Sequence, residues 1–240
     1  MESPILTTMV VLYSMGVRLD TTMLVERLPL TPVFIKLEKQ GVLKRGESKK
    51  DRIRHRAKPS APKRTTGFGH NSITMVLLSS GANTLLEKEI TVKIFQNGVF
   101  HITGVLDERY DRDVVARIRR AIEEVCPEAV LEGTWTPDTR RVVLMNYKTS
   151  LRGVSNLSRE SLHSALRRQG YKTNYEPAVY PAVKVYFPDT KWIAKVFRTG
   201  QVILTGMTTA LECEALVQQL SPALSAAVES RAPLALPMRA

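Results

Sequence analysis

Side chains that could catalyse a reaction or bind a metal are few and scattered in this sequence. The two cysteines, Cys126 and Cys213, form no CxxC pair and have no pair of histidines nearby, which argues against a zinc site and a disulfide framework. The four histidines show no ligand spacing, and no nucleophile is accompanied by a base and an orienting group. The sequence therefore predicts no enzyme, no metal site and no cofactor, and the chemistry to look for is that of binding.

The overall charge favours an anionic partner. Lys and Arg number 35 against 23 Asp and Glu, which gives a net charge of +12. Such a balance is typical of proteins that bind nucleic acid, with a merely soluble, basic surface as the alternative. No apolar run reaches the ~18 residues that span a bilayer, and the N-terminus lacks the features of a secretory signal. We expect an intracellular, reduced protein with no membrane partner.

The strongest pattern is a short segment that occurs twice. Residues 92–104 read VKIFQNGVFHITG, and residues 194–206 read AKVFRTGQVILTG. Each has a Gly-containing turn between two arms, which predicts a β-hairpin. Apolar residues alternate with other residues, so each hairpin has one core face and one mixed face. The identical positions, all 102 residues apart, are Lys93/Lys195, Phe95/Phe197, Gly98/Gly200, Thr103/Thr205 and Gly104/Gly206.

Helices are predicted on either side of each hairpin. After the hairpins, apolar residues recur at helical spacing over 109–125 and 210–227. Before them, the segments 19–28 and 157–166 each contain an N-capping residue and follow a strand-like run. Because helices would cover one face of each sheet, the opposite face stays open. An open, partly apolar face in a basic protein is a candidate binding surface.

The sequence thus predicts two copies of one unit in tandem. The first copy spans 1–128, the second spans 129–228, and 229–240 is expected to be a disordered tail. The first copy is longer because it contains an insertion at about 29–67. Within it, residues 43–64 include ten Lys or Arg and two Asp or Glu, which is typical of a flexible basic loop or arm. Its basic run at 49–56 is interpreted as a DNA-contacting arm, a localisation signal or a solvated loop, and we favour non-specific phosphate contact.

The second copy resembles TATA-box-binding proteins. Residues 175–206, YEPAVYPAVKVYFPDTKWIAKVFRTGQVILTG, are similar to that family's YEP…FPG segment and its V-L-T-G ending. The order of strands and helices and the internal duplication also match, over roughly residues 5–228. The resemblance implies an α+β, saddle-shaped fold of two tandem repeats: a curved antiparallel sheet of about ten strands with four helices on the convex face. The divergence and the basic insertion are more typical of a large DNA virus than of a cell.

The resemblance also implies a function. Proteins of that family place the concave sheet face in the minor groove, bend the DNA with Phe wedges and nucleate transcription initiation. The implied partners are double-stranded, A·T-rich DNA, a transcription factor IIB-like protein and RNA polymerase. The protein would be a monomer on DNA, in the nucleus, or in a viral factory or virion if viral.

DNA-contacting roles follow from the resemblance position by position. The hairpin wedges are Phe95 and Phe197, the other second-repeat wedge position is Tyr180, and Phe68 is its first-repeat equivalent. Glu176 lies in the segment that contacts the transcription factor IIB-like protein. The remaining positions are Thr103 and Thr205 near the central base pairs, Asn146 and its equivalent Thr8 at base edges, Ile203 as an apolar contact, and Lys191 as a phosphate contact.

Several of these positions depart from the family. Lys93 and Lys195 replace Leu, His101 replaces an apolar residue, Thr8 replaces Asn, and Tyr180 places a hydroxyl on a wedge. Together they make the concave face more polar and more basic, and Lys in a minor groove responds to groove width rather than to a base code. We therefore expect A·T-rich or loosely specific binding. The alternative is the same saddle used as an architectural or protein-interaction module, with ordinary sheet aromatics in place of wedges.

Overall fold

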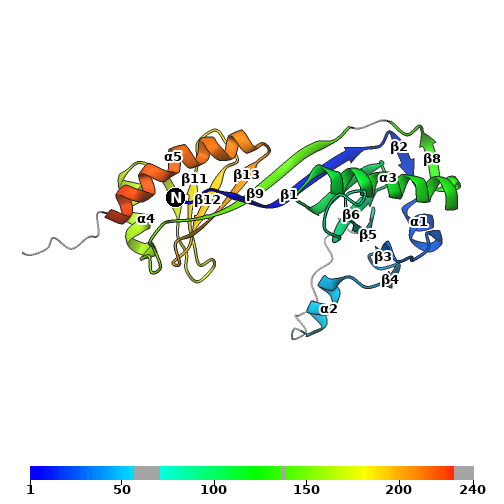
Figure 1. The fold of residues 1–240 in the computed structure, drawn as a ribbon, viewed down its shortest axis with the longest axis horizontal. Helices are drawn as coiled ribbons and strands as arrows, with labels where there is room; N and C mark the ends of the chain where they lie inside the picture. The colour runs from blue at the N-terminus through cyan, green and yellow to red at the C-terminus, as the bar shows by residue number, and fades with distance from the viewer. Residues whose placement is uncertain (57–70, 137–138, 230–240) are drawn as a thin grey trace, which may run out of the picture. The chain divides into compact units, whose positions relative to one another are not determined.

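The structure is a computed structural model that describes residues 1–56, 71–136 and 139–229 (Figure 1). Phe68, residues 57–64 of the predicted basic arm and most of the predicted tail lie outside these ranges. The chain divides into two compact units. One contains Thr8–Val143, and we call it the first-repeat unit. The other combines Met1–Thr7 with Leu144–Ala240, and we call it the second-repeat unit.

The first-repeat unit is built on an antiparallel sheet. Its strand order is β1-β7-β6-β5-β3-β4, and a separate pair joins β2 to β8. The helices of this unit are α1, α2 and α3, with a short 3-10 helix after α3. The strands are β1 (Ile5–Ser14), β2 (Val17–Leu19), β3 (Phe34–Lys39), β4 (Leu43–Gly46), β5 (Ser72–Ser79), β6 (Lys88–Phe95), β7 (Val99–Val105) and β8 (Val130–Gly133); the helices are α1 (Thr21–Arg27), α2 (Lys49–Arg56), α3 (Glu108–Val125) and η2 (Pro127–Ala129).

The second-repeat unit repeats this plan with fewer elements. Its strand order is β10-β11-β12-β13-β9, all antiparallel. Two helices, α4 and α5, pack against the sheet and share its core. The strands are β9 (Arg141–Ser150), β10 (Lys172–Asn174), β11 (Val183–Tyr186), β12 (Ile193–Val196) and β13 (Gln201–Met207); the helices are α4 (Arg159–Arg168) and α5 (Ala210–Glu229).

Both predicted hairpins are confirmed, as β6–β7 and β12–β13. Their turns depend on glycine in the same way. Gly98 and Gly200 have φ angles of +73° and +77°, in the left-handed region that disfavours a side chain. A Cβ atom would lie 2.1 Å from the Val17 carbonyl oxygen at Gly98 and 2.5 Å from the Val154 carbonyl oxygen at Gly200. The duplication therefore preserves both the turn and a close backbone approach.

The predicted core faces are also confirmed. Ile90, Val92 and Ile94 alternate along β6 and are fully buried, whereas Lys93 between them is exposed. The predicted helices form as α1, α3, α4 and α5. Asp20 accepts hydrogen bonds from two backbone amides of the first turn of α1. Ser158 caps α4 in the same way through Ser161.

The prediction of a flexible basic arm is wrong for residues 43–56. These residues form β4, which pairs with β3, and α2, which is a fifth helix beyond the four expected. Tertiary contacts explain the difference: Asp51 of α2 is bonded to Lys36 of β3. In Figure 1, α2 lies on the opposite side of the first-repeat unit from α3. In the described part of the chain, the larger sheet contains eleven strands, close to the ten expected.

Candidate nucleic-acid interface

The open face of the second-repeat unit carries a row of cations. Strand pairing places Lys184 opposite Lys195, Lys195 opposite Ile203, and Ile203 opposite Lys148. The neighbouring positions Val185, Ala194 and Leu204 are fully buried on the helix-covered face. Because successive side chains of a strand point to opposite faces, Lys184, Lys195, Ile203 and Lys148 must lie on the uncovered face. We call these four residues the lysine row. None of its four members is fully buried.

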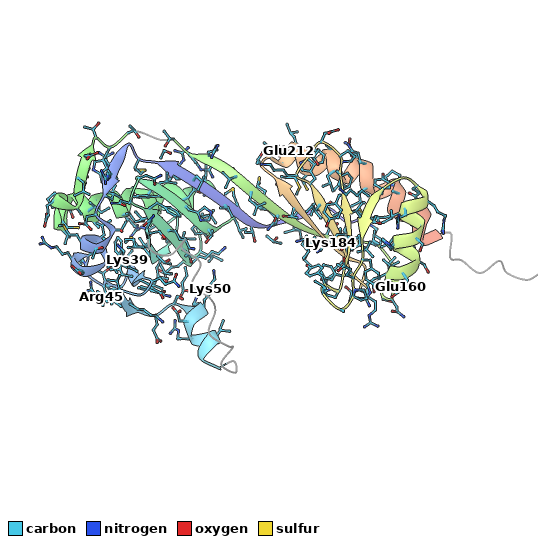
Figure 2. The ribbon with its side chains drawn as sticks, turned by 180° about the vertical axis from the view of Figure 1, so that it is seen from behind. Lys39, Arg45, Lys50, Glu160, Lys184 and Glu212 are labelled. Carbon is cyan, nitrogen blue, oxygen red and sulfur yellow. The ribbon has the colours of Figure 1, made fainter. Side chains whose placement is uncertain are left out.

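Two predicted wedge positions come together beside this row. The rings of Tyr180 and Phe197 meet edge to face, with centroids 6.0 Å apart. Lys184 Nζ lies 5.0 Å and Lys195 Nζ 5.8 Å from the centroid of the Tyr180 ring, within cation–π range. Lys184 is labelled in Figure 2. The site therefore combines aromatic edges with cations.

A hydrogen bond joins two more of the predicted contacts. The Thr205 hydroxyl donates to Asn146 Oδ1 across the β13–β9 pairing, beside an irregularity in the ladder between Leu204 and Met207. Thr103 makes a different contact: its hydroxyl donates to the Thr91 carbonyl oxygen at 3.5 Å. Thr8, the first-repeat equivalent of Asn146, is half-buried near the start of β1.

The open face of the first-repeat unit has a different character. Its corresponding row reads Thr74, Lys93, His101 and Leu12 from β5 to β1. Burial, reinforced by repulsion from Lys93, lowers the pKa of His101 and so favours its neutral imidazole. Phe95 is half-buried and pairs with Ser72. A hollow of about 370 Å³ is lined by Leu12, Lys93, Phe95, Asn97, Val99 and His101.

The segment around Glu176 is held by α4. Glu176 is exposed, and its carbonyl oxygen accepts from the amide of Tyr180 at 2.9 Å. The Tyr175 hydroxyl donates to Glu160 Oε1 at 3.1 Å, and the Arg159 guanidinium lies 5.5 Å from the centroid of the Tyr175 ring. Glu160, labelled in Figure 2, thus supplies a second carboxylate beside this segment from another element.

Four residues of the open face escaped the sequence interpretation. Lys184 and Lys148 belong to the lysine row, and Lys172 Nζ lies 6.0 Å from the ring centroid of Tyr186. The signal was present in part, because the alternation in AVKVYF places Lys184 and Tyr186 opposite the apolar face. Lys191, which was predicted, is exposed in the turn between β11 and β12.

The described residues contain no group of three His, Cys, Asp or Glu side chains that could hold a metal ion. Cys126 and Cys213 are both buried and unpaired, and burial raises the pKa of Cys213 to about 11, which keeps the thiol protonated. No helix among the described residues is long and apolar enough to cross a membrane.

Comparisons with known proteins bear on the fold and on the second-repeat unit. Residues 157–227 match the family model of transcription factor TFIID, or TATA-binding protein. Among solved structures, Methanococcus jannaschii TBP is similar at 16% identity with a TM-score of 0.57, and the match covers 94% of this chain and 99% of that chain. No curated protein sequence matches. The structural likeness shows the fold, and the family match falls on the unit with the lysine row.

Proposed function

We propose that this chain is a DNA-binding protein of the TATA-binding-protein type, which places its open sheet faces in the minor groove of duplex DNA, bends it and nucleates transcription initiation. The family match to residues 157–227 and the fold support this proposal. Phe95 and Phe197 act as wedges, with Tyr180 beside Phe197. The minor-groove mechanism and the bend are those of the family rather than consequences of the geometry alone.

The arrangement of Lys184, Lys195 and Tyr180 is the observation that carries the proposal. Two ammonium groups flank one aromatic ring at 5.0 and 5.8 Å, and the ring meets Phe197 edge to face. Cations attract the phosphate backbone, while an aromatic edge inserted into a base step replaces part of the lost stacking. A narrow minor groove of strongly negative potential attracts the two ammonium groups and presents base steps to the aromatic edge.

Fluorescence transfer between dyes at the two ends of a short A·T-rich duplex measures the bend. We expect Phe95→Ala with Phe197→Ala to abolish the protein-induced change in transfer efficiency. The matched control is Leu86→Ala with Leu211→Ala, which removes one exposed apolar side chain from each unit away from the open faces. An unchanged bend in the wedge variant would exclude the wedge role, provided that the variant still binds.

Initiation partners are the second part of the proposal. Glu176 and Glu160 provide two carboxylates at the segment that contacts a transcription factor IIB-like protein in this family. RNA polymerase is the other partner that we propose. Charge reversal with Glu160→Lys and Glu176→Lys should weaken complex formation with such a factor on DNA, while binding to DNA alone persists. Equal loss of both would indicate that these residues serve the DNA interface instead.

An architectural role is the second candidate, because Lys93, Lys195 and His101 make the open faces more polar than the family pattern. The two roles differ in sequence preference. Selection from a random duplex pool should return an A·T-rich consensus if the protein marks promoters. Absence of a consensus, together with binding lost by ~0.3 M salt, would favour the architectural role.

A further inference from the structure

The anchors of helix α2 lie on the open face of the first-repeat unit. In β3, Leu37 is fully buried and pairs with the buried Met75 on the helix-covered side. Lys36 and Glu38 alternate with Leu37 and therefore belong to the opposite side. Lys36 pairs with Val76, Val76 with Thr91, and Thr91 with Thr103. The residue that binds α2 thus stands in the same cross-strand row as a predicted DNA contact.

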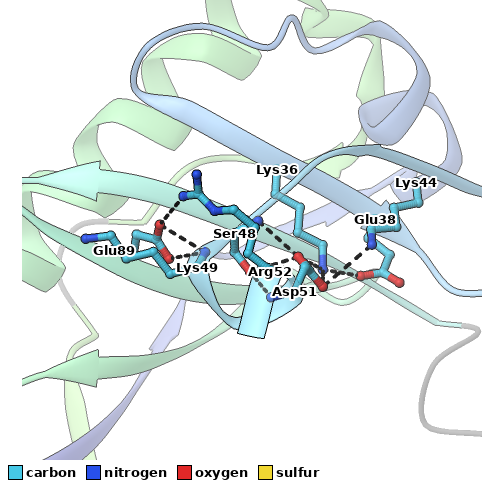
Figure 3. A network of polar contacts seen from close by, with 8 residues as sticks. All are labelled: Lys36, Glu38, Lys44, Ser48, Lys49, Asp51, Arg52 and Glu89. Atoms are coloured by element: carbon cyan, nitrogen blue, oxygen red, sulfur yellow. Dashed lines mark hydrogen bonds and ion pairs between the residues drawn. The ribbon is translucent and has the colours of Figure 1, made fainter. Parts of the chain in front are cut away.

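A buried network fixes α2 in place (Figure 3). Lys36 Nζ donates to Asp51 Oδ1 at 3.0 Å and lies 2.6 Å from Glu38. The Ser48 amide and hydroxyl donate to Asp51 Oδ2 at 3.0 and 2.8 Å. The Lys36 and Asp51 side chains are only 8% and 11% exposed. Asp51, the one acidic residue of α2, is therefore used internally and does not offset the helix's charge toward solvent.

Glu89 provides the second attachment. Its carboxylate accepts two hydrogen bonds from the Lys49 amide, at 3.0 and 3.2 Å, and lies 4.0 Å from the Arg52 guanidinium. Glu89 stands 102 residues before Lys191, so it occupies the repeat position at which the second copy carries its predicted phosphate contact. The first copy has an acidic residue there, and that residue holds a basic helix.

The outward side of α2 carries exposed cations together with one exposed apolar side chain, Ile53. Lys49 and Lys50 are exposed, and the Arg52 side chain is 62% exposed. Figure 2 shows Lys50 on α2, projecting from the helix. A polyanion approaching this open face would meet these groups first. Duplex DNA, with one charge per ~1.7 Å of axis, is the ligand that such a cluster on a DNA-facing surface fits best.

We propose that α2 is a phosphate-binding helix, held beside the open face of the first-repeat unit, that contacts the backbone of the same duplex and takes the place of the cation missing at Glu89. This inference rests on the proposed function, because it requires that the open face meets DNA. It assigns the insertion a part in DNA binding through the exposed side chains of Lys49 and Lys50, while the Lys49 amide and Asp51 anchor the helix.

The salt dependence of binding tests this proposal. Each phosphate contact contributes about 0.9 to the slope of log K against log salt concentration. We expect Lys49→Gln with Lys50→Gln to reduce the slope measured with an A·T-rich duplex by about 1 to 2. Arg167→Gln with Arg168→Gln, which removes two exposed cations from α4, is the matched control and should change the slope by less than half as much. Thermal unfolding of each variant checks that the fold is retained.

The outcomes separate the two proposals. If the unsubstituted protein binds duplex DNA and the Lys49/Lys50 variant keeps its slope, the role of α2 is overturned and the proposed function stands. If that variant binds more tightly, α2 obstructs the open face, which also overturns the inference. Failure of the unsubstituted protein to bind any duplex overturns the proposed function, and the role of α2 with it.

Discussion

Thr205 donates its hydroxyl hydrogen to Asn146 Oδ1, so one predicted DNA contact orients another. With Oδ1 engaged, the hydrogens on Asn146 Nδ2 are what the amide offers to a ligand. A·T pairs present only acceptors in the minor groove, which an amide donor complements. Under the proposed function, the pair would serve as a donor toward A·T-rich DNA.

Removal of that hydroxyl should weaken DNA binding. Thr205→Val keeps the side-chain shape but frees the Asn146 amide, and we expect affinity for an A·T-rich duplex to fall about 3- to 10-fold, the value of one net hydrogen bond. Fluorescence anisotropy titration measures it, with Ser164→Ala on α4 as the control. In a double-mutant cycle with Asn146→Ala, the two effects should overlap. Full additivity would contradict the coupling.

The pair formed by Lys36 and Asp51 should contribute strongly to the stability of the first-repeat unit. Lys36→Met leaves the Asp51 carboxylate buried with one partner fewer, at a cost of about 3 kcal/mol in the free energy of unfolding. Lys36→Met with Asp51→Leu removes both charges and should recover most of that loss. Urea denaturation followed by circular dichroism measures both. If the double variant is no more stable than the single one, the loss in the single variant does not come from an uncompensated charge on Asp51.

His101 should make stability depend on pH below neutrality. Burial, together with Lys93, lowers its pKa below the usual 6.5, so the folded protein binds this proton less readily than the unfolded chain. The stabilisation is complete above pH 6.5 and is lost as the pH falls through the folded pKa. His101→Gln should flatten the stability curve between pH 7 and 5. Lys93→Gln should raise the pKa of His101 in an NMR titration, and a fall would contradict this prediction.

Gly98 should be less replaceable than Gly153, although both have a left-handed backbone. Their φ angles are +73° and +71°, but a Cβ atom at Gly153 would meet nothing within 4 Å, whereas at Gly98 it would lie 2.1 Å from the Val17 carbonyl oxygen. Gly153→Ala should cost about 1 kcal/mol for backbone strain alone. Gly98→Ala should cost clearly more, measured by thermal unfolding. Equal costs would mean that the turn relaxes away from Val17.

The repeated elements were accessible from the sequence because their patterns are local. Alternation predicted the buried Val92 and Ile94, and capping residues marked the starts of α1 and α4. Helix α2 was not predictable in this way. Its composition is that of a solvated loop, and its order depends on Asp51 meeting Lys36, a residue 15 positions earlier. Burial of a charge pair leaves no periodic signal in the sequence.

The site was predictable where it repeats and not where it depends on strand register. Phe95 and Phe197 became candidates because they recur 102 residues apart. Lys184 was missed because its place depends on pairing with Lys195 across β11 and β12, and its first-copy equivalent, Thr74, is not basic. The partnership of Thr205 and Asn146 likewise arises from the β13–β9 ladder rather than from proximity in the chain.

The two outermost strands of the larger sheet, β4 and β10, bear on self-association. Strand β4 has four residues, including Lys44 and Arg45, and ends at Gly46 with a φ angle of +72°. Strand β10 has three residues and begins with Lys172. Short, charged margins give a neighbouring molecule few backbone groups to pair with. Both edges of the sheet thus discourage edge-to-edge pairing between copies, which suits the proposed role of a monomer on DNA.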